Sequence, residues 1–234
     1  MMGEKGLQAV IFDLDGTLLD SMHVWEQVDQ RFLRENRILP PAGISDRLKT
    51  MGIREAAAFF ISEFALDMTP EQVDKAIDEC IALKTMTVCV RGCDIDRALE
   101  KCAGTETKVS CVLDFPYGYS GAAAKRAIAR DYAARGVYEI DMVMNYGAAR
   151  GGNWDIVEEE VRGVVEEAHK KGVGVKVIFE TSQLNDEQIR RGTEVCIAAG
   201  ADFVKTSTGF NGAGATVEAV KAMLETANGR IKVK

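Results

Sequence analysis

The chain has 234 residues, is 47% hydrophobic and carries a formal net charge of −7 at pH 7, which suits one large α/β domain or two smaller ones. The acidic balance argues against nucleic acid or an anionic membrane as the main partner. No apolar run is long enough to span a bilayer and the N-terminus lacks the layout of a signal peptide, so we expect a cytoplasmic protein.

The first element in chain order is a predicted strand, the apolar run from Leu7 to Phe12, which leads into FDLDGTLLDS. In this stretch Asp13 and Asp15 flank one apolar residue, and a Gly-Thr pair turns the chain away. Carboxylate oxygens suit Mg²⁺, so Asp13 could attack a phosphoryl group beside the metal while Asp15 shuttles a proton. The pattern indicates phosphoryl transfer at a sheet edge.

Helices are predicted from Met22 to about Leu83, where apolar residues recur at three- and four-residue spacing. Thr69 followed by Pro70 is a typical N-cap and first-turn signal for the last of these helices. The motif AVIFDLDGTLLDS and the helical stretch resemble haloacid-dehalogenase-type phosphatases and phosphomutases, such as β-phosphoglucomutase, with an α-helical cap. The resemblance implies a nucleophile, a general acid/base and Mg²⁺ as cofactor, with the first two roles and the metal contacts falling to Asp13 and Asp15.

The remainder of a phosphatase site does not follow. That family completes its site after the cap with a strand ending in Ser or Thr, a Lys and a further acidic pair. From Thr85 onward none of these appears in family order, although an anionic transition state needs positive partners. The plainer interpretation is that Asp13 and Asp15 are a strand-end pair without a working site.

From Thr85 the chain alternates between short apolar strands and amphipathic helices. The predicted strands cover residues 86–90, 108–115, 138–145, 173–180, 202–208 and 230–234. The predicted helices run from Ile95 to Cys102, Ala122 to Arg135, Trp154 to Lys171, Asn185 to Ala199 and Thr216 to Ala227. Short connections in such a series predict parallel strands with right-handed crossovers, and six units in a row favour a barrel over an open sheet.

The predicted fold class is therefore α/β, with two parts. Residues 1–84 are expected to form a first strand and an α-helical cap-like segment, and residues 85–234 an incomplete TIM (β/α) barrel. The last predicted strand stops at Lys234, where a seventh or eighth strand should continue. The strand at Val10–Leu14 could occupy the first barrel position, with the helical segment packed outside.

Two other groups of side chains receive structural interpretations. The six cysteines show no zinc spacing. Four of them lie in apolar stretches and are predicted to be reduced core thiols: Cys89, Cys102, Cys111 and Cys196. The acidic run at residues 158–160 predicts a solvated helix face.

Strand alternation brings four charged side chains to one face of the predicted barrel. When the purely apolar faces are turned toward the helices, the side chains directed to the barrel axis are Asp141, Lys176, Lys205 and Lys234. Cations around one amine in a desolvated barrel mouth lower its pKa, so that it can attack a carbonyl while a carboxylate relays protons. This predicts a Schiff-base enzyme. Alternatively, the lysines reach a wet end of the barrel or pair structurally with Asp141 and Glu180.

Three longer motifs, AGADFVKTSTGF, EIDMVMNYGAARGGNWD and VKVIFET, resemble deoxyribose-phosphate aldolase over roughly residues 85–234. The resemblance implies that Lys205 forms a Schiff base with acetaldehyde and that Asp141 and Lys234 run the proton relay. The enamine would then add to glyceraldehyde 3-phosphate, and the reverse reaction would cleave 2-deoxyribose 5-phosphate. Supporting or substrate-lining roles are implied for Lys176, Thr208 and Gly209.

The chain also departs from the aldolase pattern. The family's first strand and helix are not recognisable, and CVRG at residues 89–92 replaces the usual Cys-Val-Asn-Pro. The Gly-Gly turn and last strand, whose backbone amides hold the phosphate in that family, do not follow Lys234. We expect truncation to impair turnover.

The first functional hypothesis is a class I aldolase, an aldehyde-lyase of deoxyribonucleotide catabolism that needs no cofactor and takes a small phosphorylated sugar or aldehyde. A Mg²⁺-dependent phosphatase or phosphomutase is the second. The third is a non-catalytic fusion or scaffold, a chimera that associates through exposed strand edges. A homo-oligomer is a further expectation, whereas nucleic acid and membrane partners are not expected.

Overall fold

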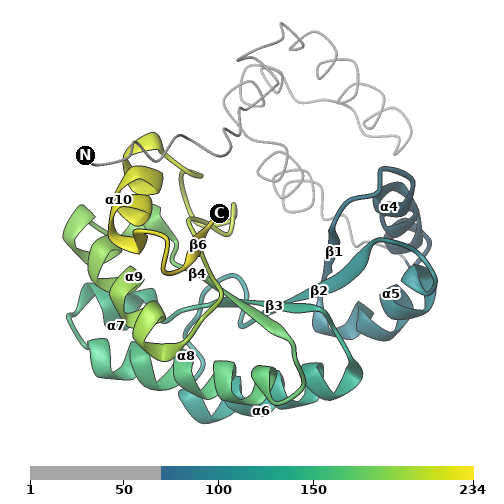
Figure 1. The fold of residues 1–234 in the computed structure, drawn as a ribbon, viewed down its shortest axis with the longest axis horizontal. Helices are drawn as coiled ribbons and strands as arrows, with labels where there is room; N and C mark the ends of the chain where they lie inside the picture. The colour runs from purple at the N-terminus through teal and green to yellow at the C-terminus, as the bar shows by residue number, and fades with distance from the viewer. Residues whose placement is uncertain (1–69) are drawn as a thin grey trace, which may run out of the picture. The chain divides into compact units, whose positions relative to one another are not determined.

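The computed structural model describes residues 70–234, in which six parallel strands alternate with helices (Figure 1). The strands are β1 (Thr87–Val90), β2 (Lys108–Leu113), β3 (Glu139–Val143), β4 (Gly174–Ile178), β5 (Phe203–Lys205) and β6 (Lys232–Val233). The helices are α4 (Pro70–Ala82), α5 (Ile95–Cys102), α6 (Ala122–Arg135), α7 (Tyr146–Arg150), α8 (Trp154–His169), α9 (Asp186–Ala199) and α10 (Val217–Ala227). Two 3-10 turns cover Gly92–Asp94 and Thr181–Gln183.

The strands pair in sequence order from β1 to β6, and every pairing is parallel. The sheet is curved, and helices α5 to α10 lie along its outer side (Figure 1). Among the described residues β1 and β6 are the two edges of the sheet. This arrangement confirms the predicted incomplete (β/α) barrel.

Local sequence signals explain where several helices begin and end. A capping box opens α9, because the Asn185 side chain accepts from the Gln188 N–H and the Gln188 side chain accepts from the Asn185 N–H. Gly200 ends this helix with a φ of 85°, a left-handed conformation that glycine adopts without a steric penalty. The Thr216 side chain caps α10 by accepting from the Ala219 N–H.

Each central strand buries both of its faces. On β3, Ile140 and Met142 belong to the apolar core, while Glu139 and Asp141 on the opposite face are also buried. Because side chains alternate along a strand, the apolar set packs toward the helices and the charged set faces the inside of the curve. The hydrophobic core of the described part therefore lies between the sheet and the helices. The inner face of the curved sheet carries the charged side chains.

Three details differ from the prediction. The strands are shorter than predicted, most of all β5, because the chain leaves the regular ladder after Lys205. The strand predicted over residues 138–145 ends at Val143, and the short helix α7, which Asn145 caps, lies between it and the helix predicted from Trp154. Cys89 is exposed and not a core thiol, because it lies on the edge strand β1 and alternates with the buried Val88; the other three predicted core thiols are buried.

The acidic run at residues 158–160 was also interpreted wrongly in part. Glu159 is exposed, but Glu160 is buried together with Val157 and Val161, because all three lie on the face of α8 that packs inward.

Most of the predicted N-terminal part lies outside the described residues. Only α4 and the turn after it belong to the described part of the segment 1–84. Asp13, Asp15 and the predicted strand at Val10–Leu14 fall outside it, so the phosphatase-like reading and the domain boundary stay predictions. No helix within residues 70–234 is long and apolar enough to cross a membrane.

Candidate active site

Three of the four predicted inward residues meet on the inner face of the sheet. Asp141 on β3 pairs directly in register with Lys176 on β4, and Lys205 is the last residue of β5. The Lys176 Nζ atom lies 3.0 Å from Asp141 Oδ1, and the Lys205 Nζ atom lies 3.8 Å from Asp141 Oδ2. All three residues are buried, so one carboxylate lies within ionic range of two amines in a desolvated interior.

Glu139 is a fourth member of this group, and sequence reasoning missed it. Its carboxylate accepts a hydrogen bond from Lys176 Nζ, and both side chains are buried. Burial is the largest single effect on Lys176 and opposes its charge, but the attraction of Asp141 and Glu139 outweighs it and raises the pKa of Lys176. Lys176 is therefore a fixed cation held by two carboxylates.

The position of Lys205 is typical of a catalytic residue in this architecture. In (β/α) barrels the carboxyl ends of the strands and the loops that follow them carry the reacting groups. Lys205 ends β5, and its backbone is fixed because its carbonyl accepts from the Phe179 N–H at 2.9 Å. Its amine is thus presented from a rigid element.

The predicted substrate-lining residues follow Lys205 directly. Thr208 is buried, and its hydroxyl and its N–H both donate to the carboxylate of Glu180, the N–H at 3.3 Å. Glu180 itself is fully buried and has a φ of 57°. Burial is the largest effect on Glu180 and raises its pKa. Gly209 has a φ of 82°, which explains why glycine suits this turn.

Lys234, the fourth predicted inward residue, is positioned by its backbone hydrogen bonds to the chain at and after β5. Its N–H donates to the Val204 carbonyl at 2.9 Å and its carbonyl accepts from the Thr206 N–H at 3.0 Å, so it continues β6 beside β5. The residue is exposed. Its part in a proton relay stays a prediction.

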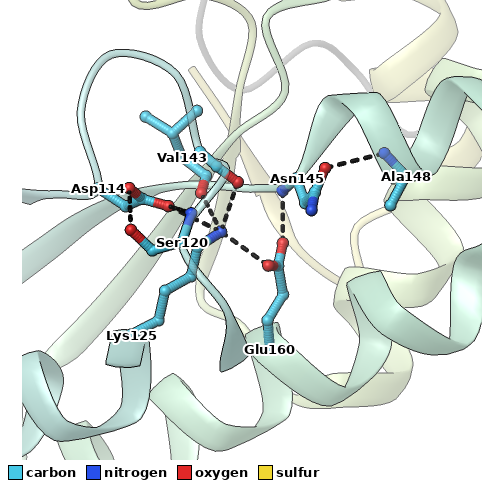
Figure 2. Close-up of polar contacts among 8 residues, drawn as sticks. Asp114, Ser120, Lys125, Val143, Asn145, Ala148 and Glu160 are labelled. Carbon is cyan, nitrogen blue, oxygen red and sulfur yellow. Dashed lines mark hydrogen bonds and ion pairs between the residues drawn. The ribbon is translucent and has the colours of Figure 1, made fainter. Parts of the chain in front are cut away.

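A second buried charge cluster lies at the carboxyl ends of β2 and β3, and we name it the Lys125 cluster: Asp114, Ser120, Lys125 and Glu160 (Figure 2). The Lys125 Nζ atom lies 2.7 Å from Glu160 Oε2 and 3.4 Å from Asp114 Oδ2. It also donates to the carbonyls of Val143 at 2.9 Å and Gly118 at 3.0 Å. This one amine therefore ties α6 and α8 to the strand that carries Asp141.

Glu160 completes the connection to the backbone after β3. Its Oε1 atom accepts from the Asn145 N–H, so the Lys125 cluster holds the chain on both sides of Met144 (Figure 2). Burial is the largest effect on Glu160 and raises the pKa of its carboxyl to about 7, although Lys125 acts in the opposite direction. The cluster fixes where β3 ends and α7 begins.

Sequence reasoning missed the Lys125 cluster, although one signal was present. Lys125 lies on the same helical face as Ala129 and Ala133, both buried, at spacings of four and eight residues. A lysine in line with small apolar residues indicates a buried, paired amine. Among residues 70–234, no group of three or more His, Cys, Asp or Glu side chains is arranged to hold a metal ion.

Comparison with known proteins finds similar aldolases both among sequences and among solved structures. A deoxyribose-phosphate aldolase from Staphylococcus aureus is 44% identical over 168 residues, which cover 72% of this chain and 76% of the relative. A solved structure from Coccidioides immitis, described as a deoxyribose-phosphate aldolase, is 37% identical with a TM-score of 0.69 and covers 72% of this chain and 67% of that one. A tetrameric deoxyribose phosphate aldolase from Aeropyrum pernix, 24% identical with a TM-score of 0.64 over 83% of each chain, shares the fold. No family model matches the chain.

Proposed function

This chain belongs to the deoxyribose-phosphate aldolase family, and we propose that it cleaves 2-deoxyribose 5-phosphate reversibly to glyceraldehyde 3-phosphate and acetaldehyde through a Schiff base on Lys205. The single observation that carries this proposal is the buried triad of Lys205, Asp141 and Lys176, with Asp141 3.8 Å from the proposed nucleophile. An amine confined beside a carboxylate and a second, fixed cation is suited to carbonyl chemistry.

The chemistry follows from an amine and an aldehyde. The Lys205 amine adds to C1 of the open-chain sugar, and loss of water gives an iminium ion. The C2–C3 bond then breaks as the C3 hydroxyl gives up its proton, which releases glyceraldehyde 3-phosphate and leaves the electron pair in an enamine. Protonation of C2 and addition of water release acetaldehyde and restore the amine.

The neighbouring residues have separate roles in this scheme. Asp141 is the proton carrier, because its Oδ2 atom faces Lys205 while its Oδ1 atom is held by Lys176. Lys176 stays protonated, since its pKa is raised after burial is offset by two carboxylates. Lys176 and Lys205 thus share the one carboxylate of Asp141. Lys234 would be the second relay group.

The direct experiment measures cleavage of 2-deoxyribose 5-phosphate by coupled detection of glyceraldehyde 3-phosphate. We expect turnover in the unaltered chain and none above background in Lys205→Ala. The matched control is Lys221→Ala, which removes an exposed amine from α10 and should leave the rate unchanged. Equal rates in Lys205→Ala and the unaltered chain would refute the assignment.

The alternatives are less well supported. The relatives reported above are aldolases, whereas Asp13 and Asp15 with their Mg²⁺ lie outside the described residues. Mg²⁺-dependent phosphate release that is lost in Asp13→Asn would revive the phosphatase reading. Self-association is a further proposal, supported by the edge positions of β1 and β6 among the described strands. Sedimentation over a concentration series tests it.

A further inference from the structure

Ser207 follows Lys205 by two residues, and its hydroxyl group has no hydrogen-bond partner among the described residues. Ser207 is 8% exposed, and its Oγ atom is buried without a hydrogen-bond partner in the part of the chain that the structure describes. A buried hydroxyl that lacks a partner carries a free-energy penalty, which a bound ligand can remove. Such a group two residues after the proposed nucleophile is a candidate substrate contact.

The backbone around Ser207 is held firmly. On the N-terminal side, Thr206 donates its N–H to the Lys234 carbonyl at 3.0 Å and accepts at its own carbonyl from the Thr181 N–H at 2.9 Å. On the C-terminal side, the Thr208 N–H donates to Glu180 at 3.3 Å. With both neighbours anchored, the backbone at Ser207 is held in place on either side.

The hydroxyl of Thr208 differs from that of Ser207 because it is already in use. Thr208 Oγ1 donates its proton to Glu180 and accepts from the Phe210 N–H at 3.0 Å. Its single proton is therefore committed, so it cannot donate to a sugar without breaking a buried bond. The Ser207 hydroxyl can both donate and accept.

From this contrast we infer that Ser207 is a specificity-determining residue whose hydroxyl binds a hydroxyl group of the sugar held on Lys205. The inference rests on the proposed function and extends it. It predicts discrimination by chemical class, because 2-deoxyribose 5-phosphate carries free hydroxyls and acetaldehyde carries none. A site built to pair with a substrate hydroxyl favours the substrate that supplies one.

The test compares two reactions of Ser207→Ala. The kcat/KM for 2-deoxyribose 5-phosphate should fall about tenfold, as expected for loss of one hydrogen bond near 1.4 kcal/mol. The rate at which borohydride traps the acetaldehyde adduct on Lys205 should change less than about twofold, since acetaldehyde offers no hydroxyl. Thermal unfolding should not occur at a lower temperature, because the variant removes an unsatisfied polar group.

The matched control is Thr226→Ala in α10, which removes a hydroxyl that already donates to the Ala222 carbonyl at 2.8 Å. It should leave both reactions unchanged. An equal loss in both reactions of Ser207→Ala, or no loss in either, would overturn the inference while leaving the aldolase assignment intact. If the unaltered chain forms no acetaldehyde adduct on Lys205, the proposed function fails first and the inference with it.

Discussion

The Nζ atom of Lys205 lies 3.8 Å from Oδ2 of Asp141, within ionic range but beyond a normal hydrogen bond. The other oxygen of the same carboxylate lies 3.0 Å from Lys176 Nζ, within hydrogen-bond range. Asp141 is thus anchored by one lysine and faces the other. The structure thus holds the proposed proton carrier in a fixed position beside the proposed nucleophile.

Replacing Asp141 by asparagine should leave the fold intact and remove the proposed proton carrier. We expect kcat for 2-deoxyribose 5-phosphate to fall about 10²- to 10⁴-fold, the usual contribution of a positioned acid or base. Lys176 keeps Glu139 as a partner, so thermal unfolding should change little. The control Asp155→Asn alters an exposed carboxylate in α8, and full activity in Asp141→Asn would contradict the relay.

Replacing Lys176, the fixed cation of the site, should lower the free energy of unfolding. In Lys176→Met, the carboxylates of Glu139 and Asp141 remain buried without their shared partner, so we expect a loss of about 3–5 kcal/mol in the free energy of unfolding. Urea denaturation measures this loss. The exposed ion pair of Lys84 with Glu106 gives the control, because Lys84→Met should be indistinguishable from the unaltered chain. Similar effects for both variants would show that the interior is wetter than the structure indicates.

Gly118 should tolerate no side chain. It has a φ of 68°, and an added Cβ would lie 2.2 Å from the Met144 carbonyl oxygen, beside the Lys125 cluster. Gly118→Ala should therefore destabilise the chain by about 3 kcal/mol or more. Gly152→Ala is the matched control, since its φ of 76° is similar but nothing lies within 4 Å, so only the backbone penalty of about 1–2 kcal/mol applies. Equal losses would mean that the close approach to Met144 is absent.

The Lys125 cluster predicts a pH dependence of stability. Burial raises the pKa of Glu160 from 4.5 to about 7, so between these values the folded chain keeps a proton that the unfolded chain releases. The free energy of unfolding should therefore fall, by about 3 kcal/mol at most, as the pH rises from 4.5 to 7. Below 4.5 both states are protonated and above 7 both are ionised, so this contribution is flat there.

Glu160→Gln should remove that slope, and urea denaturation at stepped pH between 4 and 9 measures it. The exposed neighbour Glu159 supplies the matched control, Glu159→Gln, whose profile should follow that of the unaltered chain. A slope that persists in Glu160→Gln would assign it to another group.

Much of the fold was readable from local patterns. α5 and α6 begin and end at the predicted residues. The end of α6 is explained by Gly136, which has a left-handed φ of 89°. The face of each strand also followed from alternation, which placed Asp141, Lys176 and Lys205 together correctly. Strand ends were harder, because a ladder stops where its neighbour stops, and β5 is limited by pairings to β4 and β6.

The rest of the site depended on distances across the fold. Lys125 and Glu160 are 35 residues apart in sequence and meet only because α6 and α8 lie side by side. Glu139 was within reach of sequence reasoning, since it shares a strand face with Asp141 two residues away. The unpartnered hydroxyl of Ser207 was not, because Thr208 beside it carries the same chemical group and only the hydrogen bond of the Thr208 hydroxyl to Glu180 distinguishes the two.

The most direct measurement is peptide mapping of the chain after treatment with acetaldehyde and borohydride, which converts the Schiff base to a stable ethyl-lysine. One modified peptide is predicted, with the added mass on Lys205 and none on Lys176, which stays protonated between two carboxylates. An added mass on Lys176, or one spread over surface lysines with Lys205 unmodified, would contradict the account.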